Sequence, residues 1–215
     1  MGEPRERPIL FSGPMVRAIL EGRKTQTRRV VAGQRALAPG VTQFSLGGLA
    51  GWVANDSAVR EEATRLLPRI ERGDRLWVRE SLRQSEDYAR WEYAADGLAL
   101  RSQPAAWGAR CAWTERVSNR SHVPSIHMPR WASRITLAVT SVRVERLQGI
   151  SEEDARAEGV TPFPADPEGD CCTDGKHRTA FEYLWGEING WDSINGKRKG
   201  FAWSDNPWVW VVGFE

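Results

Sequence analysis

Apolar residues recur with strand or helix spacing in a limited number of segments along the 215-residue chain. Residues 8–11 predict a short strand, and Ser12-Gly13-Pro14 then predicts the start of a helix that ends at Gly22. The β-branched residues between Thr25 and Val31 indicate the next strand. The Gly-, Ala- and Ser-rich residues 32–55 instead predict a loop.

The middle of the chain predicts a charged helix over residues 56–67. Gly73-Asp74 is a turn signal, and a strand is predicted directly after it over residues 75–80. Alternation along that strand places Trp77 and Arg79 together on the face opposite its apolar side chains. Both side chains are therefore available for binding.

The longest predicted strand lies in the second half of the chain. Residues 88–101 predict a hairpin, and residues 102–130 predict a long ordered loop. Residues 134–146 then form the clearest strand pattern, but its apolar positions change parity near Thr140-Ser141. Such a slip of one residue predicts a β-bulge there.

Two helices and a final strand are predicted near the C-terminus. Ser151 to Asp154 forms a capping box, and the helix that it opens should end at Gly159, which places Glu158 on the last turn. Residues 178–188 have the spacing of an amphipathic helix. Residues 207–212 predict a strand.

Short strands, few helices and the absence of a βαβ rhythm indicate an α+β fold built on a small β-barrel with flanking helices. The pattern shows neither an internal repeat nor a clear domain boundary. We therefore expect a single domain over residues 1–215.

Composition bears on the expected cellular location and on metal binding. Apolar residues make up 40% of the chain, and no apolar run approaches the ~20 residues that span a bilayer. Residues 1–14 lack a signal pattern, so the expected location is cytoplasmic and no membrane partner is expected. Cys171, Cys172 and His177 could supply zinc ligands, but vicinal cysteines lack metal-site spacing, which favours a polar loop without metal or cofactor.

Charge is concentrated at the N-terminal end. The net charge is only +2, but residues 1–35 carry eight basic side chains against three acidic ones. Arginine outnumbers lysine 26 to 4. This bias suits the binding of phosphates and bases, but a GC-rich gene would produce it without any functional meaning. The run from Arg23 to Arg29 surrounds Lys24 with cations, which can bind an anion and favour loss of the lysine proton.

Three motifs together resemble the ASCH domain, a superfamily whose β-barrel is related to the PUA RNA-binding fold. They are ILEGRKTQTR at residues 19–28, GDRLWV at residues 73–78 and ISEEDARAEG at residues 150–159. The resemblance covers residues 8–31, 70–82, 130–160 and 205–215, and it implies insertions at about 32–69, 83–123 and 162–204. Longer proteins of this kind are often encoded by phages and prophages.

The resemblance also implies an activity. Some small bacterial ASCH proteins are amidohydrolases that remove the acetyl group of N4-acetylcytidine with a lysine, a threonine and a glutamate. The matching positions are Lys24, Thr27 and Glu158, so the implied function is amide cleavage of an N4-acylated cytosine. This chain is about twice as long as those enzymes, which leaves the substrate open.

The residues permit a structural explanation as well. Lys24 could belong to a solvated edge, Thr27 could be an ordinary strand residue, and Glu158 a helix-end carboxylate. Residues three apart on a regular strand face opposite sides, so Lys24 would have to lie before the strand to reach Thr27. The candidate substrate-binding residues are Arg23, Thr25, Arg28, Trp77, Arg79, His127 and Trp131. For the two tryptophans a role in the core is favoured, and His127 is equally a candidate for the core.

Other functions stay open. The chain could be an RNA- or DNA-binding PUA-like module, a nuclease that needs no metal, or a phage accessory protein with protein contacts. The expected partner is a modified nucleoside or a nucleic acid, with RNA favoured over DNA. No motif indicates an oligomeric state.

Overall fold

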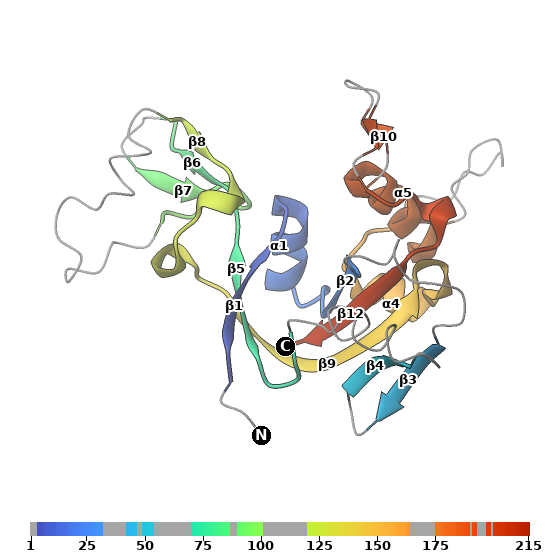
Figure 1. The fold of residues 1–215 in the computed structure, drawn as a ribbon. Coiled ribbons are helices and arrows are strands. Elements are labelled where there is room, and N and C mark those ends of the chain that lie inside the picture. Colours follow the sequence, from blue (N-terminus) through green and yellow to red (C-terminus); the bar gives the residue numbers. More distant parts are fainter. Residues whose placement is uncertain are drawn as a thin grey trace, which may run out of the picture. The chain divides into compact units, whose positions relative to one another are not determined.

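The computed structural model has mixed α+β content, which confirms the coarse fold class (Figure 1). It describes residues 4–31, 42–46, 49–53, 70–86, 90–100, 120–163, 175–189, 191–192, 197–198 and 200–215. The chain groups into two compact units, of which the first comprises Met1–Gly22 and Gly73–Ala138 and the second Arg23–Arg72 and Val139–Glu215. The single domain expected from the sequence stays a prediction.

The first unit contains a three-stranded sheet in which β5 lies between β1 and the start of β9. Its elements are β1 (Glu6–Leu10), α1 (Gly13–Leu20), β5 (Arg75–Arg79), β6 (Leu82–Gln84), β7 (Trp91–Tyr93), β8 (His122–Val123), η3 (Ser125–His127), η4 (Arg130–Ala132) and the beginning of β9 (Thr136–Arg146). β1 runs parallel to β5, and β9 runs antiparallel to it. The predicted glycine stop of α1 is confirmed, because Gly22 has a φ of 71°.

A second small sheet in this unit has the order β7-β6-β8. The predicted hairpin is present, since Tyr93 N donates to Leu98 O at 2.8 Å and Leu100 N to Trp91 O at 2.8 Å. A core cluster of buried residues lies beside this sheet, formed by Leu82, Tyr93, Val123, Met128 and Ala132.

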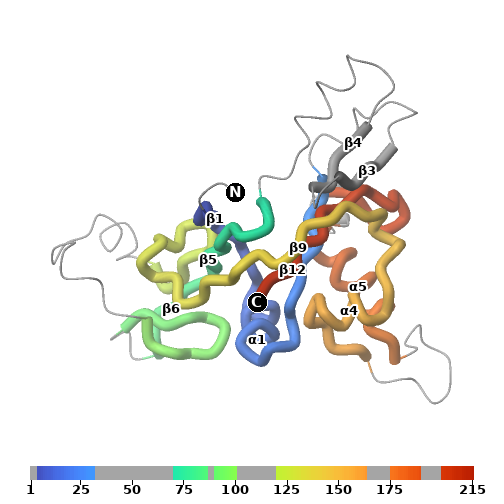
Figure 2. The backbone as a smooth tube through the Cα atoms, turned by 90° about the horizontal axis from the view of Figure 1, so that it is seen from below, coloured from blue at the N-terminus to red at the C-terminus, as the bar shows by residue number. Residues whose placement is uncertain are grey.

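The second unit is built on the antiparallel strands β9, β12 and β2, with β12 in the centre. Its elements are β2 (Gln26–Val30), β3 (Thr42–Leu46), β4 (Leu49–Val53), the rest of β9, η5 (Leu147–Gly149), α4 (Glu152–Ala157), α5 (His177–Asn189), β10 (Trp191–Asp192), β11 (Lys197–Arg198), η6 (Trp203–Asp205) and β12 (Trp208–Phe214). Helices α4 and α5 lie next to each other in both views (Figures 1 and 2).

Side chains on one face of β12 bind the two helices to this sheet. Val209 and Val211 are fully buried and pack in one cluster with Ala155 of α4 and Phe181 and Trp185 of α5. The predicted amphipathic spacing is confirmed for Phe181 and Trp185, both 4% exposed. Burial of such side chains contributes roughly 1.5–3 kcal/mol each, so this face fixes α4 on the sheet.

The predicted bulge in β9 is confirmed. Gly213 of β12 pairs with Ser141, but the next residue, Phe214, pairs with Val139, so Thr140 has no partner in the ladder. The parity change that the sequence shows at this position is therefore a one-residue insertion in the strand. It turns Arg143 and Glu145 toward the face that carries α4.

One expectation was wrong. Residues 32–55 were predicted to be loop, but residues 42–46 and 49–53 pair as the antiparallel strands β3 and β4. The many small residues of this segment concealed two short strands, which gain stability from pairing rather than from propensity. The helix predicted over residues 56–67 lies outside the described residues.

Among the described strands no sheet closes on itself, since the hydrogen-bonded order ends at β1 on one side and at β2 on the other. The β-barrel therefore stays a prediction. Within the described part of the chain, no helix has the length and apolar character needed to cross a bilayer.

Candidate functional site

Lys24 and Glu158 meet at the entrance to β2. Lys24 Nζ lies 2.9 Å from Glu158 Oε2 and 2.8 Å from the backbone oxygen of the same residue. The two residues also form an isolated antiparallel β-bridge, and Thr25 N donates to Ala157 O at 2.9 Å. Backbone and side-chain bonds thus bring together the lysine and the glutamate that the sequence motifs singled out.

Helix α4 places Glu158 because its two ends are defined by the sequence. Ser151 is the N-cap, and its hydroxyl accepts a hydrogen bond from Asp154 N at 3.1 Å. Gly159 follows with a φ of 79°, a conformation that glycine adopts without strain and that ends helices. Glu158 is the C-cap residue between them, as predicted.

Arg28 is the second cation on Glu158, and it joins three carboxylates. Its Nη1 donates to Glu158 Oε1 at 3.0 Å. Its Nη2 donates to Asp154 Oδ2 at 2.9 Å and to Glu145 Oε2 at 3.1 Å. The planar guanidinium suits this arrangement, because it holds donors on separate nitrogens in a fixed geometry, which a single ammonium nitrogen does not.

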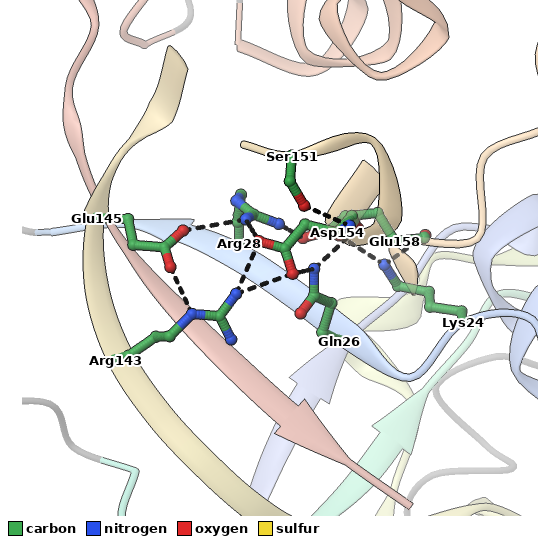
Figure 3. Close-up of polar contacts among 8 residues, drawn as sticks. All are labelled: Lys24, Gln26, Arg28, Arg143, Glu145, Ser151, Asp154 and Glu158. Carbon is green, nitrogen blue, oxygen red and sulfur yellow. Dashed lines mark hydrogen bonds and ion pairs between the residues drawn. The ribbon is translucent and has the colours of Figure 1, made fainter. Parts of the chain in front are cut away.

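Arg143 and Gln26 add hydrogen bonds to Asp154 beside the Lys24–Glu158 pair (Figure 3). Arg143 Nη2 donates to both oxygens of Asp154, at 2.9 and 2.8 Å. Gln26 Nε2 donates to the backbone oxygen of Asp154 at 2.8 Å and to its Oδ1 at 3.1 Å. Strands β2 and β9 and helix α4 all contribute, so the cluster ties α4 to the sheet.

The cluster has a buried centre and a partly exposed rim, and its charges balance. The side chains of Lys24 and Arg28 have no exposed surface, and that of Glu158 is 4% exposed. Lys24, Arg28 and Arg143 supply three positive charges, and Glu145, Asp154 and Glu158 supply three negative ones. Buried ions persist in proteins when they are paired in this way.

Arg28 Nε departs from this pattern of paired groups. It is buried, and it has no hydrogen-bond partner within the described part of the chain. The guanidinium carbon lies 5.9 Å from the ring centroid of Phe181, so the aromatic face supplies part of its surroundings. An unsatisfied buried donor costs about 1–3 kcal/mol, which the three carboxylates offset.

The surroundings lower the pKa of two groups in the cluster, Lys24 and Asp154. Loss of hydration lowers the pKa of Lys24, the Glu158 carboxylate opposes that change, and the charges of Arg29 and Arg28 add to it. For Asp154, desolvation raises the pKa, but the hydrogen bonds from Arg143 and Gln26 and the charge of Arg28 outweigh it, so the net pKa is lowered. Asp154 is therefore held as a carboxylate, whereas Lys24 loses its proton more readily than a solvated lysine.

Thr27 is not brought to this centre. Gln26 and Arg28 both bond to α4, so alternation directs the Thr27 side chain to the opposite face of β2. Thr27 is 3% exposed, and no hydrogen bond between described residues joins its hydroxyl to Lys24 or Glu158. Thr27 thus faces away from the side chains of Gln26 and Arg28, whereas Lys24 lies before the start of β2.

Of the three candidate substrate-binding residues near Lys24, two are exposed and one is buried. Arg23 is exposed, and its Nη1 donates to Gly159 O at 2.8 Å. Thr25 is exposed, and its backbone oxygen accepts from Phe214 N at 2.8 Å. Arg28 belongs to the buried cluster, so of these three only Arg28 contacts the Glu158 carboxylate.

The remaining candidates lie in the first unit. Trp77 and Arg79 share one face of β5, as predicted, with the Arg79 guanidinium carbon 5.3 Å from the Trp77 ring centroid. His127 is exposed in η3. Trp131 is partly buried and packs against the core cluster of this unit, which is the core role that the sequence left open.

The sequence pattern did not single out Gln26, Arg143 or Glu145, and it indicated Asp154 only as part of a helix cap. A signal was present, because Arg143 and Glu145 alternate with apolar residues after the bulge. Charged residues at that spacing indicate a polar face, but their partners come from a distant helix.

No group of metal-ligating side chains is found among the described residues. Cys171 and Cys172 lie outside them. His177 Nδ1 lies 3.0 Å from Glu152 Oε1, which occupies its ring nitrogen.

Comparison with known proteins adds no assignment. No protein-family model, curated protein or solved structure matches the chain.

Proposed function

We propose that the protein is a hydrolase that cleaves the exocyclic amide of an N4-acylated cytosine, with Lys24 and Glu158 as its proton-handling pair. The observation that carries the proposal is the buried contact of 2.9 Å between Lys24 Nζ and Glu158 Oε2. A buried lysine with a lowered pKa beside a carboxylate is a recurrent arrangement in catalytic sites.

We infer an ASCH-type, PUA-like fold from the places of the three motifs in the structure. GDRLWV spans the turn at Gly73 and most of strand β5. ISEEDARAEG spans helix α4 with its N-cap and its glycine stop. The third motif runs from the end of α1 into β2 and supplies Lys24.

The chemistry divides between the two side chains. Glu158 takes a proton from water as the hydroxide adds to the acyl carbon, and the Lys24 ammonium donates a hydrogen bond to the resulting oxyanion. When the tetrahedral intermediate collapses, the bond from carbon to N4 breaks, and the proton returns from Glu158 to the departing amine. The products are a carboxylic acid and the free cytosine base.

The burial of the pair sets a condition on this reaction. Because the Lys24 side chain has no exposed surface, a substrate reaches it only after neighbouring side chains move. Exclusion of water would then strengthen the hydrogen bond to the oxyanion. The balanced charge of the cluster also argues against a phosphate-binding role for these residues.

The proposal assigns the attack to water rather than to Thr27, because alternation directs Thr27 to the other face of β2. Replacement of Thr27 by valine preserves its shape and removes its hydroxyl. A hydrolase that uses water retains turnover in the Thr27→Val variant, whereas a threonine nucleophile would be lost with the hydroxyl.

The test is incubation of the full chain with N4-acetylcytidine, free and within an oligonucleotide, followed by chromatographic detection of the deacetylated base. Lys24→Gln and Glu158→Gln should each lose at least about 100-fold in rate. Glu153→Gln is the matched control, since it makes the same change on an exposed residue of α4. Absence of turnover on both substrates by the native chain, or full activity of Glu158→Gln, would overturn the proposal.

A further inference from the structure

Arg28 connects the Glu158 carboxylate to the carboxylates beside it (Figure 3). Its side chain has no exposed surface. Nη1 donates to Glu158 Oε1 at 3.0 Å, whereas Nη2 donates to Asp154 Oδ2 at 2.9 Å and to Glu145 Oε2 at 3.1 Å. Because a guanidinium is planar and rigid, the bonds on Nη2 also fix the direction of the bond on Nη1.

The two oxygens of Glu158 have separate cations. Lys24 Nζ lies 2.9 Å from Oε2, and Arg28 Nη1 lies 3.0 Å from Oε1. In the proposed reaction, Lys24 moves its hydrogen bond from Oε2 to the oxyanion, and Oε2 then takes a proton from water. Arg28 stays on Oε1 during this exchange. A fixed contact on one oxygen keeps the carboxylate oriented while the contact on the other oxygen changes.

The charge of Arg28 is already compensated by carboxylates of the chain. Glu145, Asp154 and Glu158 all accept hydrogen bonds from it. The sequence made Arg28 a candidate for substrate binding, but these contacts direct it to the Glu158 carboxylate instead. Arg28 can therefore act on the reaction only through its neighbours.

Charge pairing alone does not explain a buried arginine at this position. Glu145 and Asp154 also pair with Arg143, and Glu158 also pairs with Lys24, so each carboxylate keeps a cation without Arg28. Buried ion pairs add little to stability, because the loss of hydration offsets their attraction. The arrangement also leaves Arg28 Nε without a hydrogen-bond partner in the described part of the chain. A departure of this kind from full pairing is expected at functional sites.

We propose that Arg28 is a positioning residue of the hydrolase, which holds the Glu158 carboxylate through Oε1 while Lys24 exchanges its contact with Oε2 for the substrate. This role rests on the proposed function of Lys24 and Glu158. It requires no contact between Arg28 and the substrate.

Arg28 also acts on Lys24 through its charge. Burial is the largest cause of the lowered pKa of Lys24, the Glu158 carboxylate opposes it, and the charges of Arg29 and Arg28 add to it. The charged groups around Lys24 are Glu158 at the end of α4, Arg28 and Arg29 on β2 and, bonded to Arg28 or its partners, Asp154 on α4 and Glu145 and Arg143 on β9. Removal of Arg28 therefore has an electrostatic effect on Lys24 that can be measured without a substrate.

The experiment compares Arg28→Gln with Arg143→Gln, the matched control. Both changes remove a guanidinium from Asp154 and Glu145, but only Arg28→Gln removes one from Glu158. Steady-state rates on N4-acetylcytidine give kcat and KM. NMR of the full chain carrying isotope-labelled lysine follows the protonation of Lys24 as the pH changes. The chain has four lysines, so the Lys24 signal is identified by its absence in Lys24→Gln.

Arg28→Gln should lower kcat about 100-fold with little change in KM, because the carboxylate is misplaced whereas the substrate contacts remain. Its Lys24 titration should move to higher pH, because a repelling charge is lost and Glu158 then pairs with Lys24 alone. Arg28→Lys restores the charge without the planar fork, so it should restore the Lys24 titration but only part of the rate. Arg143→Gln should leave kcat and the Lys24 titration close to those of the native chain.

Three results would overturn the proposal: an unchanged Lys24 titration in Arg28→Gln, a native kcat in that variant, or equal effects of Arg28→Gln and Arg143→Gln. Circular dichroism identifies a variant that fails to fold. If Arg28→Gln does so, Arg28→Lys decides, since a native kcat there would show that the planar fork does not position Glu158. The lysine titration needs no turnover, so absence of hydrolysis by the native chain counts against the hydrolase, whereas an unchanged titration counts against the role of Arg28.

Discussion

Lys24 Nζ donates to both the carboxylate and the backbone oxygen of Glu158, a residue 134 positions further along the chain. The first bond pairs two buried charges, and the second satisfies a carbonyl at the end of α4 that lacks a partner within the helix. One lysine therefore both neutralises the carboxylate and caps the helix. Removal of Lys24 and removal of Glu158 should therefore lower the free energy of unfolding by different amounts.

Glu158→Gln should destabilise the protein more than Lys24→Met. Without Lys24, the Glu158 carboxylate still accepts from Arg28 at 3.0 Å. Without Glu158, the buried Lys24 loses its counter-charge, a change that costs about 3–5 kcal/mol in other proteins. Urea denaturation followed by circular dichroism gives both free energies of unfolding.

Glu153→Gln serves again as the control, because Glu153 is exposed on the same helix, and its change should stay within about 0.5 kcal/mol. A loss in Lys24→Met that equals or exceeds the loss in Glu158→Gln would show that Arg28 does not support the carboxylate.

Asp154 predicts a dependence of stability on acid pH. Its pKa is lowered in the folded protein, because bonds from Arg143 and Gln26 and the charge of Arg28 outweigh desolvation. The folded state then binds fewer protons than the unfolded state, so this stabilisation is present above the unfolded pKa of about 3.9. It is lost as the pH falls through the lowered value.

Asp154→Asn should therefore reduce stability at neutral pH and flatten the fall of stability below about pH 4. Urea unfolding between neutral and acid pH measures this slope. Glu182→Gln, on the exposed side of α5, is the comparison, and its profile should follow that of the native chain. An Asp154→Asn profile parallel to the native one would contradict the assigned ion pairs.

The sequence predicted the elements that local rules define. Alternation identified β5 and β9, a run of Trp and Val identified β12, a serine cap and a glycine stop identified α4, and a parity change located the bulge near Thr140. These signals work because each is contained within one segment. The strands β3 and β4 escaped prediction because their stability depends on pairing.

The sequence predicted only part of the candidate site. The pairing of Lys24 with Glu158 was expected from what the motif resemblance implies, and it required no knowledge of the sheet. The three carboxylates on Arg28 could not be anticipated, because they come from β9 and α4, whose neighbours are fixed by long-range packing. Thr27 shows the reverse case, since alternation alone separates its side chain from those of Gln26 and Arg28 on the same strand.

The lowered pKa of Lys24 predicts the shape of the pH–rate profile. In the proposed reaction the protonated lysine donates to the oxyanion, so kcat/KM should fall as the pH rises through the pKa of Lys24. Burial lowers that pKa, which places the alkaline limb below the usual lysine value of about 10.4. Steady-state rates on N4-acetylcytidine across alkaline pH locate this limb.

A comparison with Lys24→Arg separates this group from others that titrate at high pH. A guanidinium stays protonated throughout the range, so any residual activity of that variant should lack the alkaline limb. A limb that persists unchanged in Lys24→Arg would assign the titration to another group.

The β-bulge brings the side chains of Ser141 and Thr140 close to Gly213. A Cβ atom at this position would lie 2.5 Å from Ser141 Oγ and 3.3 Å from Thr140 Oγ1, so Gly213→Ala should cost about 1–3 kcal/mol. Ser141→Ala removes the closest atom and leaves Thr140 Oγ1 at 3.3 Å as the nearest contact, so the double variant should regain part of the loss. A double-mutant cycle in urea measures this coupling.

Gly186→Ala is the matched control. Nothing lies within 4 Å of its added Cβ, and alanine favours helix α5 by up to about 1 kcal/mol, so the stability of this variant should rise. Equal effects of Ser141→Ala in the presence and absence of the alanine at position 213 would mean that the bulge does not create the clash.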